Sequence, residues 1–170
     1  MNNRIVYTRT SIPLGELTVA ASGGGLYGVW FTGQKYFPVI DTSWVEDAQT
    51  PILREAVAQL AAYFAGARTR FDLPLAMRGT HFQQVVWTAI GAVEFGTTTT
   101  YGALAAHTGN ASSVRAAGAA TGRNPWSIVI PCHRIVGGGG ALTGYAGGLE
   151  RKRALLAHED KVAASLRRAA

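Results

Sequence analysis

The chain has 170 residues, 48% of them hydrophobic and 15% charged, which is the composition of a folded protein with one compact domain or two small ones. Its single cysteine, Cys132, cannot form an intramolecular disulfide, and with only four scattered histidines it excludes a Cys-based zinc cluster. The formal net charge is +6, and residues 80–170 hold nine Lys/Arg against four Asp/Glu, which favours nucleic acid as a partner, although a merely basic soluble surface explains the charge equally well.

The first third of the chain predicts a β meander followed by a helix. Three β-rich runs, 5–7, 15–21 and 26–31, are separated by turns that contain glycine or proline. Thr50 before Pro51 predicts a capped helix start, and this helix is expected to stop at Gly66. Apolar residues at helical spacing would pack it on the meander: Leu53, Val57, Leu60, Tyr63 and Phe64.

Residues 67–79 mix charges with proline and glycine and are expected to link this α+β unit to a second one. Thr80 and Gln83 then predict a capping box that begins a helix reaching about Val93.

Two shorter helices, 101–108 and 113–122, are predicted around a turn with glycine. This arrangement is typical of a helix-turn-helix, although a plain helical pair in a core fits the pattern equally well. The second helix has Arg115 as its one long polar side chain before Arg123. It can therefore approach a nucleic-acid backbone closely but has little with which to read bases.

The run 128–130 is apolar and predicts a short strand that Pro131 ends, so that Cys132 lies at the strand's end. A lone cysteine in such a place is usually a small buried hydrophobic residue. Here, however, His133 and Arg134 supply a base and positive charge near the sulfur, and a flexible tetraglycine follows.

Adjacent residues on a strand point to opposite faces, so either the chain leaves strand geometry at Cys132 or a water molecule bridges thiol and imidazole. Glu159, in the last predicted helix, is the candidate carboxylate that would orient His133. The sequence alone does not select it, since exposed carboxylates near helix ends are mostly solvated.

The motif Pro131-Cys132-His133-Arg134 resembles that of the O6-alkylguanine-DNA alkyltransferase (methylated-DNA–protein-cysteine methyltransferase) family. Asn124-Pro125 and Tyr101-Gly before the motif and the segment 143–148 after it strengthen the resemblance, which extends from Thr80 to Glu159. The segment 11–18 is similar to the family's opening hairpin.

The resemblance implies direct-reversal DNA repair: irreversible transfer of an alkyl group, above all methyl, from O6-alkylguanine in duplex DNA to Cys132 after the nucleotide is flipped out. O4-alkylthymine is a second expected substrate. His133 would act as base, Glu159 would orient it, and Tyr101 would donate a proton toward guanine N3. Because an S-alkylcysteine is a thioether without a carbonyl for water to attack, each molecule should react once.

The resemblance also assigns the other site residues. Arg115 would fill the space left in the base stack, and Asn124 would tie the helix pair to the active-site strand. Further DNA contacts are expected from Ser113, Ala116, Thr100 and Arg123. The guanine pocket is expected to be lined by Trp126, Ser127, Ile135, Tyr145 and Ala146, with the loop 137–148 as its wall.

The expected fold is α+β: an N-terminal β-meander and helix domain of ribonuclease-like type (1–78), a mostly helical C-terminal domain with the helix-turn-helix and a short active-site strand (79–160), and a solvated tail (161–170). No metal, cofactor or protein partner is expected. The stretch 95–114 is too polar to span a membrane and no apolar signal core begins the chain, so a cytoplasmic protein is expected, monomeric, with cooperative binding to DNA left open.

Two other functions remain open at this point. A non-enzymatic lesion-binding relative of the family would have another residue in place of Cys132. A Cys-His-Glu acyl transferase or hydrolase would explain the nucleophile but not the basic helix pair. One departure concerns the pocket: many family members have Asn-Pro-x-Pro where this chain has Asn124-Pro-Trp-Ser127.

Overall fold

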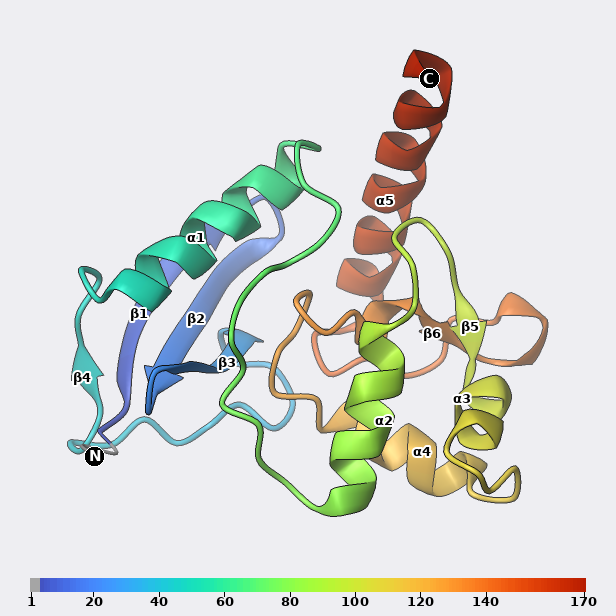
Figure 1. Cartoon of the computed structure of the whole chain (residues 1–170), viewed down its shortest axis with the longest axis horizontal. Helices are drawn as coiled ribbons and strands as arrows, with labels where there is room; N and C mark the ends of the chain where they lie inside the picture. Colours follow the sequence, from blue (N-terminus) through green and yellow to red (C-terminus); the bar gives the residue numbers. More distant parts are fainter. Residues whose placement is uncertain (1–3) are drawn as a thin grey trace. The chain divides into compact units, whose positions relative to one another are not determined.

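The computed structural model describes residues 4–170, which form two compact units (Figure 1). The first unit extends to Met77 and also contains Pro125–Val129, and the second consists of Arg78–Asn124 and Ile130–Ala170. The α+β fold class is confirmed. The stretch 125–129, expected in the C-terminal domain, groups with the first unit.

A four-stranded sheet forms the first unit, with the order β3-β2-β1-β4. The strands β1 (Val6–Ile12), β2 (Gly15–Ser22) and β3 (Gly25–Phe31) form the predicted antiparallel meander, and the short β4 (Val45–Glu46) pairs parallel with β1. Pairing continues to Ile12 opposite Gly15, so the first hairpin turn is tighter than the sequence predicted.

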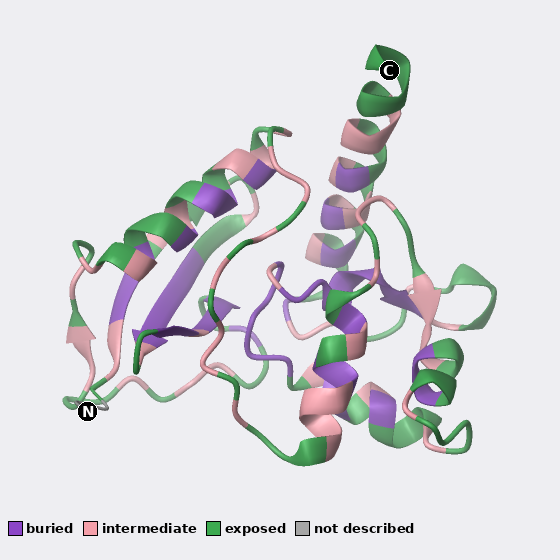
Figure 2. Ribbon diagram, viewed as in Figure 1, coloured by how far each residue is buried: buried purple, intermediate pink, exposed green. Residues whose placement is uncertain are grey.

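The helix α1 (Pro51–Phe64) packs on this sheet through Leu53, Ala56, Leu60 and Tyr63, which are all fully buried (Figure 2). Proline stands at the first helical position as predicted. The predicted cap is wrong in its chemistry, because the Thr50 side chain makes no capping bond and donates instead to Asp47 Oδ2 at 2.9 Å.

The residues just before the active-site turn pair with β3. Val29 N donates to Pro125 O at 2.8 Å and Ser127 N donates to Val29 O at 2.9 Å. The strand predicted at 128–130 is wrong: Ile128 has a φ of 72° and Val129 N bonds to Ser127 O, so the chain turns there. A short apolar run is buried in a turn or a strand alike, and its composition could not distinguish them.

Three helices begin the second unit. α2 (His81–Gly91) has the predicted capping box between Thr80 and Gln83, and it ends two residues before the predicted Val93. α3 (Tyr101–His107) and α4 (Val114–Gly122) form the predicted helix pair. The α4 residues are mostly small, and Trp87 of α2 donates its indole N–H to Ala120 O at 2.8 Å.

A parallel pair of two-residue strands, β5 (Thr99–Thr100) and β6 (Ile135–Val136), joins the helix pair to the active-site turn η1 (Cys132–Arg134). The tetraglycine forms a short 3-10 turn, η2 (Gly138–Gly140). α5 (Leu149–Ala169) continues through the predicted tail: residues 161–169 are helical, with mostly exposed side chains from Ser165 onward (Figure 2). None of the helices within residues 4–170 is long and apolar enough to span a bilayer.

Candidate active site

Cys132 lies at the start of a 3-10 turn and is 5% exposed. Two bonds fix this turn: Asn124 at the end of α4 donates its side-chain amide to Ile130 O at 2.8 Å, and Cys132 N donates to the same carbonyl at 2.8 Å. Of the two alternatives left by the sequence, the chain takes the first and leaves strand geometry. Successive side chains in a 3-10 turn do not alternate between opposite faces.

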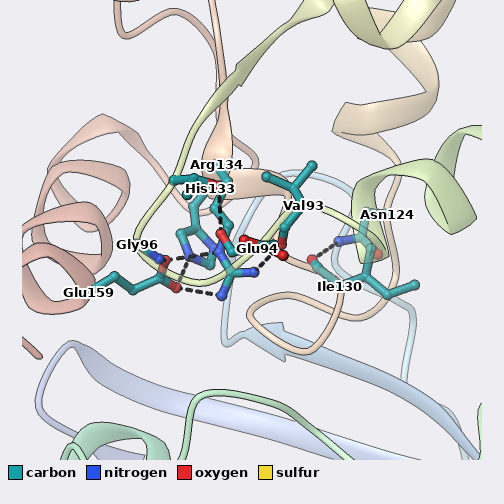
Figure 3. Close-up of polar contacts among 9 residues, drawn as sticks. Val93, Glu94, Gly96, Asn124, Ile130, His133, Arg134 and Glu159 are labelled. Atoms are coloured by element: carbon teal, nitrogen blue, oxygen red, sulfur yellow. Dashed lines mark hydrogen bonds and ion pairs between the residues drawn. The ribbon is translucent and has the colours of Figure 1, made fainter. Parts of the chain in front are cut away.

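His133 is fully buried and its Nε2 lies 2.7 Å from Glu159 Oε1 (Figure 3). Its other ring nitrogen, Nδ1, is also buried, and it has no hydrogen-bond partner among residues 4–170. The turn η1 and the helix α5 therefore bring together two of the predicted catalytic side chains, His133 and Glu159. The Nε2 atom of His133 is bound by Glu159, and its Nδ1 atom is available to accept a proton.

Arg134 binds the same carboxylate from a second direction. Its Nε donates to Glu159 Oε2 at 2.8 Å and its Nη2 donates to Oε1 at 2.9 Å, while Nη1 donates to Val93 O at 2.6 Å (Figure 3). Gly96 N donates to Glu159 Oε2 at 3.2 Å, and the Arg134 guanidinium lies 5.6 Å from the Phe95 ring centre. Sequence reasoning gave Arg134 only a general positive charge near the sulfur.

The protonation states follow from these contacts. Burial would raise the pKa of Glu159, but the hydrogen bonds and the charges of His133 and Arg134 together outweigh it and hold the pKa well below its usual range. Burial, with the charges of Arg134 and Lys152, lowers the pKa of His133 despite the opposing bond and charge of Glu159, so the imidazole is neutral near pH 7. A neutral ring that donates from Nε2 to the carboxylate has its lone pair on Nδ1.

Burial also raises the pKa of the Cys132 thiol, and a hydrogen bond with the Asn124 side chain and the charge of Lys152 act in the opposite direction. The expectation that neighbouring positive charge lowers this pKa is thus met only in part, because the loss of hydration is the larger effect. A protonated thiol beside a neutral imidazole is the resting arrangement, and the thiolate must form during the reaction.

Tyr101 begins α3 and is half-buried, with its hydroxyl donating to Thr143 O at 3.1 Å. Burial raises the pKa of this phenol, and the negative charge that Cys132 carries as a thiolate raises it further. Thr100, predicted as a DNA contact, caps the same helix by accepting from Ala103 N at 3.1 Å.

Sequence reasoning missed Lys152. Its side chain is fully buried, and its Nζ donates to the main-chain carbonyls of Ile135, Thr143 and Gly144. A signal was present, because Lys152 precedes Glu159 by seven residues, which puts both on one face of a helix.

Three of the predicted DNA contacts, Ser113, Arg115 and Ala116, lie at the start of α4. Arg115 and Ala116 are exposed on its first turn, and Ser113 precedes them with its hydroxyl bonded to Asn110 O at 2.6 Å. Arg123 lies at the other end of the helix and is exposed. Arg115 is the one long polar side chain on this first turn, where its exposed neighbours are Val114 and Ala116.

The predicted pocket residues are divided between the two units. Ile135 is buried in β6, and Tyr145 and Ala146 are half-buried in the loop before α5. Trp126 and Ser127 belong to the first unit, where the indole N–H donates to Leu26 O at 2.8 Å and the serine hydroxyl bonds to Gln34 at 3.2 Å. The structure gives these two side chains a structural role, and their place in a guanine pocket stays a prediction.

Two family models match the chain over most of its length. The DNA-binding domain of 6-O-methylguanine DNA methyltransferase matches residues 81–161, and the ribonuclease-like domain of the same family matches residues 5–77. Among curated relatives, the methylated-DNA–protein-cysteine methyltransferase of Mycolicibacterium paratuberculosis is 44% identical over 157 residues, covering 92% of this chain and 93% of its own. The constitutive enzyme of Bacillus subtilis is 39% identical over 157 residues, covering 92% and 95%.

Solved structures agree with these matches. The O6-methylguanine methyltransferase of Mycobacterium tuberculosis is similar with a TM-score of 0.84 and 44% identity, covering 92% of this chain and 93% of that chain. The structure of the same organism's enzyme in complex with DNA gives a TM-score of 0.85 and 43% identity, covering 92% and 94%. With both family domains present and full-length relatives at this identity, the chain belongs to the methylated-DNA–protein-cysteine methyltransferase family.

Proposed function

We propose that this chain repairs DNA by moving the alkyl group of O6-alkylguanine from the base to Cys132. One observation supports this reading above the others: a buried imidazole beside Cys132 is hydrogen-bonded to Glu159 through Nε2 and has its Nδ1 available. A base of this kind can take the thiol proton, directly or through one water molecule.

The transfer is a displacement at the alkyl carbon. The Cys132 proton moves to His133 Nδ1, the thiolate forms the new S–C bond, and the C–O bond breaks with its electron pair going to guanine O6. Negative charge then spreads over the base, and Tyr101 donates a proton toward N3. The step leaves His133 as an imidazolium and Tyr101 as a phenolate. Once solvent has taken the proton from the imidazolium and returned one to the phenolate, the net change is one proton moved from the thiol to the base.

Glu159 and Arg134 support the proton acceptor. The carboxylate fixes which imidazole nitrogen carries hydrogen and stabilises the imidazolium that forms. The guanidinium holds the carboxylate in place with two bonds. After transfer Cys132 carries a thioether, and no group in the site can remove it, so the protein acts once.

Duplex DNA with an alkylated guanine is the substrate in this proposal, and O4-alkylthymine is a second one. The target atom lies inside the duplex, so the nucleotide must leave the stack. The exposed Arg115, among small residues at the start of α4, suits insertion into the vacated space. A monomeric, cytoplasmic protein remains the expectation from the sequence.

The test uses a known amount of protein and excess duplex oligonucleotide with a radiolabelled methyl group on guanine O6. We expect label on the protein to rise to about one equivalent and stop, and we expect none on Cys132→Ala. Release of product beyond one equivalent would contradict the stoichiometric reaction and favour a hydrolase. Tight binding of the lesion without transfer would favour the non-enzymatic lesion binder.

A further inference from the structure

Lys152 is a fully buried cation whose polar contacts in the described chain are all with main-chain carbonyls. Its Nζ lies 2.5 Å from Ile135 O, 3.2 Å from Thr143 O and 3.1 Å from Gly144 O. An ammonium group has three hydrogens, so these three bonds use all of them. Lys152 thereby joins the first turn of α5 to the end of the active-site segment and to the loop before the helix.

Two of these carbonyls are also the acceptors of Tyr101. The phenol hydroxyl lies 3.1 Å from Thr143 O and 3.5 Å from Gly144 O, and the Lys152 ammonium lies 5.8 Å from the centre of the phenol ring. A phenol has one hydrogen to donate. Tyr101 therefore cannot donate this hydrogen to Thr143 O and to a substrate at the same time.

We propose that Lys152 is a positioning residue that frees Tyr101 for the substrate. This inference rests on the proposed function, in which Tyr101 donates toward the guanine ring. When the phenol hydrogen turns to the base, the carbonyls of Thr143 and Gly144 lose a donor but keep Lys152. Thr143 and Gly144 are exposed residues, but without Lys152 the phenol is the last side-chain donor in the described chain to their carbonyls, so we expect the hydroxyl to stay bonded to the loop.

The loop itself gives Lys152 a second reason to matter for Tyr101. Gly144 has a φ of 56°, and a Cβ built there would lie 4.0 Å from the Tyr101 hydroxyl, so the segment passes close to the phenol. Two bonds from a buried ammonium hold the carbonyls of this segment toward the inside of the unit. The direction in which the phenol hydrogen points thus depends on a residue that need not touch the base.

A double-mutant cycle tests this coupling. The variants are Tyr101→Phe, Lys152→Met and the two together, and the measurement is the single-turnover rate of methyl transfer from duplex DNA. Each rate is divided by the rate at which iodoacetamide alkylates Cys132 in the same variant, which removes any effect on the thiol alone. Arg153→Met is the matched control, since Arg153 is the exposed cation next to Lys152 on α5.

We expect Tyr101→Phe to lower the normalised rate by about 100-fold, the low end of the range for a lost proton donor, and Lys152→Met by a smaller factor of about 30-fold, because the phenol itself remains. The double variant should be no more than about threefold slower than Tyr101→Phe, and Arg153→Met should stay within about twofold of the wild type. A double variant slower by the product of the two single effects overturns the inference.

If Lys152→Met loses its helical circular dichroism, the same cycle is run with Lys152→Arg. Arginine keeps donors for the carbonyls but presents them in a different geometry, so a smaller effect of the same coupled kind is expected. If the double variant with Lys152→Arg is slower by the product of the two single effects, the inference is overturned as well. A wild-type protein that transfers no methyl group would refute the proposed function instead, so the two failures are distinguishable.

Discussion

The Arg134 guanidinium binds both oxygens of the Glu159 carboxylate, Oε2 at 2.8 Å and Oε1 at 2.9 Å, and it shares Oε1 with the bond to His133. Gly96 N supplies a fourth donor. A carboxylate has room for about four such bonds, so this one is saturated. It cannot rotate, and its charge is already balanced when the imidazole next to it takes up a proton.

Replacing Arg134 with Met should destabilise the fold. It removes two hydrogen bonds and the balancing charge from the buried Glu159 carboxylate, and breaking a buried pair in this way costs about 3–5 kcal/mol. We expect the urea midpoint to fall by a corresponding amount. The control Arg54→Met removes an exposed cation of α1 and should change the free energy of unfolding by less than about 0.5 kcal/mol. Equal effects of the two substitutions would show that the buried pair contributes nothing.

Acid should destabilise the protein through His133. The unfolded chain takes up a proton at this imidazole below about pH 6.5, whereas burial lowers the pKa in the folded chain, so the folded state resists protonation. The free energy of unfolding should therefore fall as the pH is lowered from about 7 to about 5, by up to about 1.4 kcal/mol per pH unit for this group. Glu159, whose folded pKa is well below its usual range, adds a second loss that starts near pH 4.3.

Urea unfolding at several pH values measures this dependence. In His133→Asn the slope between about pH 7 and pH 5 should be smaller than in the wild type, because the titrating group is gone while the other histidines remain. A wild-type stability that stays level or rises on acidification would contradict the assignment of a neutral buried imidazole.

The sequence predicted the regular parts of this fold well. The meander, the capping box at Thr80 and the helix pair after Thr100 depend on local signals: turn residues, caps and apolar spacing. The strand predicted at 128–130 was wrong because turn residues, caps and apolar spacing are weak signals in this segment. Ile128 adopts a φ of 72° because bonds to β3 before it and the Asn124 bond after it constrain the chain, and neither is local in the sequence.

The site residues could be predicted where they are adjacent in the sequence. Cys132 and His133 stand side by side in a distinctive motif, whereas Glu159 was one candidate carboxylate from the last helix that the sequence alone did not select. The contacts of Arg134 with Glu159 and of Lys152 with the loop carbonyls join segments that only the tertiary fold brings together. Buried charges bound to main-chain atoms leave little trace in composition, which is why Lys152 escaped notice.

Binding to duplex DNA should depend steeply on salt and weakly on sequence. The exposed face of α4 offers Arg115 and small residues, with Arg123 at its end, so phosphate contacts dominate and base contacts are few. With Cys132→Ala protein, which binds without transfer, Arg123→Ala should weaken affinity equally for different flanking sequences and reduce the salt slope by about 1. Fluorescence anisotropy over a range of salt concentrations measures both. A loss confined to one flanking sequence would mean that Arg123 reads bases.

Arg115→Ala should separate base flipping from alkyl transfer. The arginine is exposed on α4 and lies outside the catalytic cluster of Cys132, His133 and Glu159, so the chemistry of a free alkylguanine base should proceed within about twofold of the wild-type rate. In duplex DNA the nucleotide must leave the stack, which costs a few kcal/mol, and a side chain that fills the vacated space offsets part of this. We expect the duplex reaction to slow by about tenfold or more. Single-turnover rates on both substrates, with Arg54→Ala as the exposed-cation control, measure the difference, and an equal loss on free base and duplex would exclude a flipping role for Arg115.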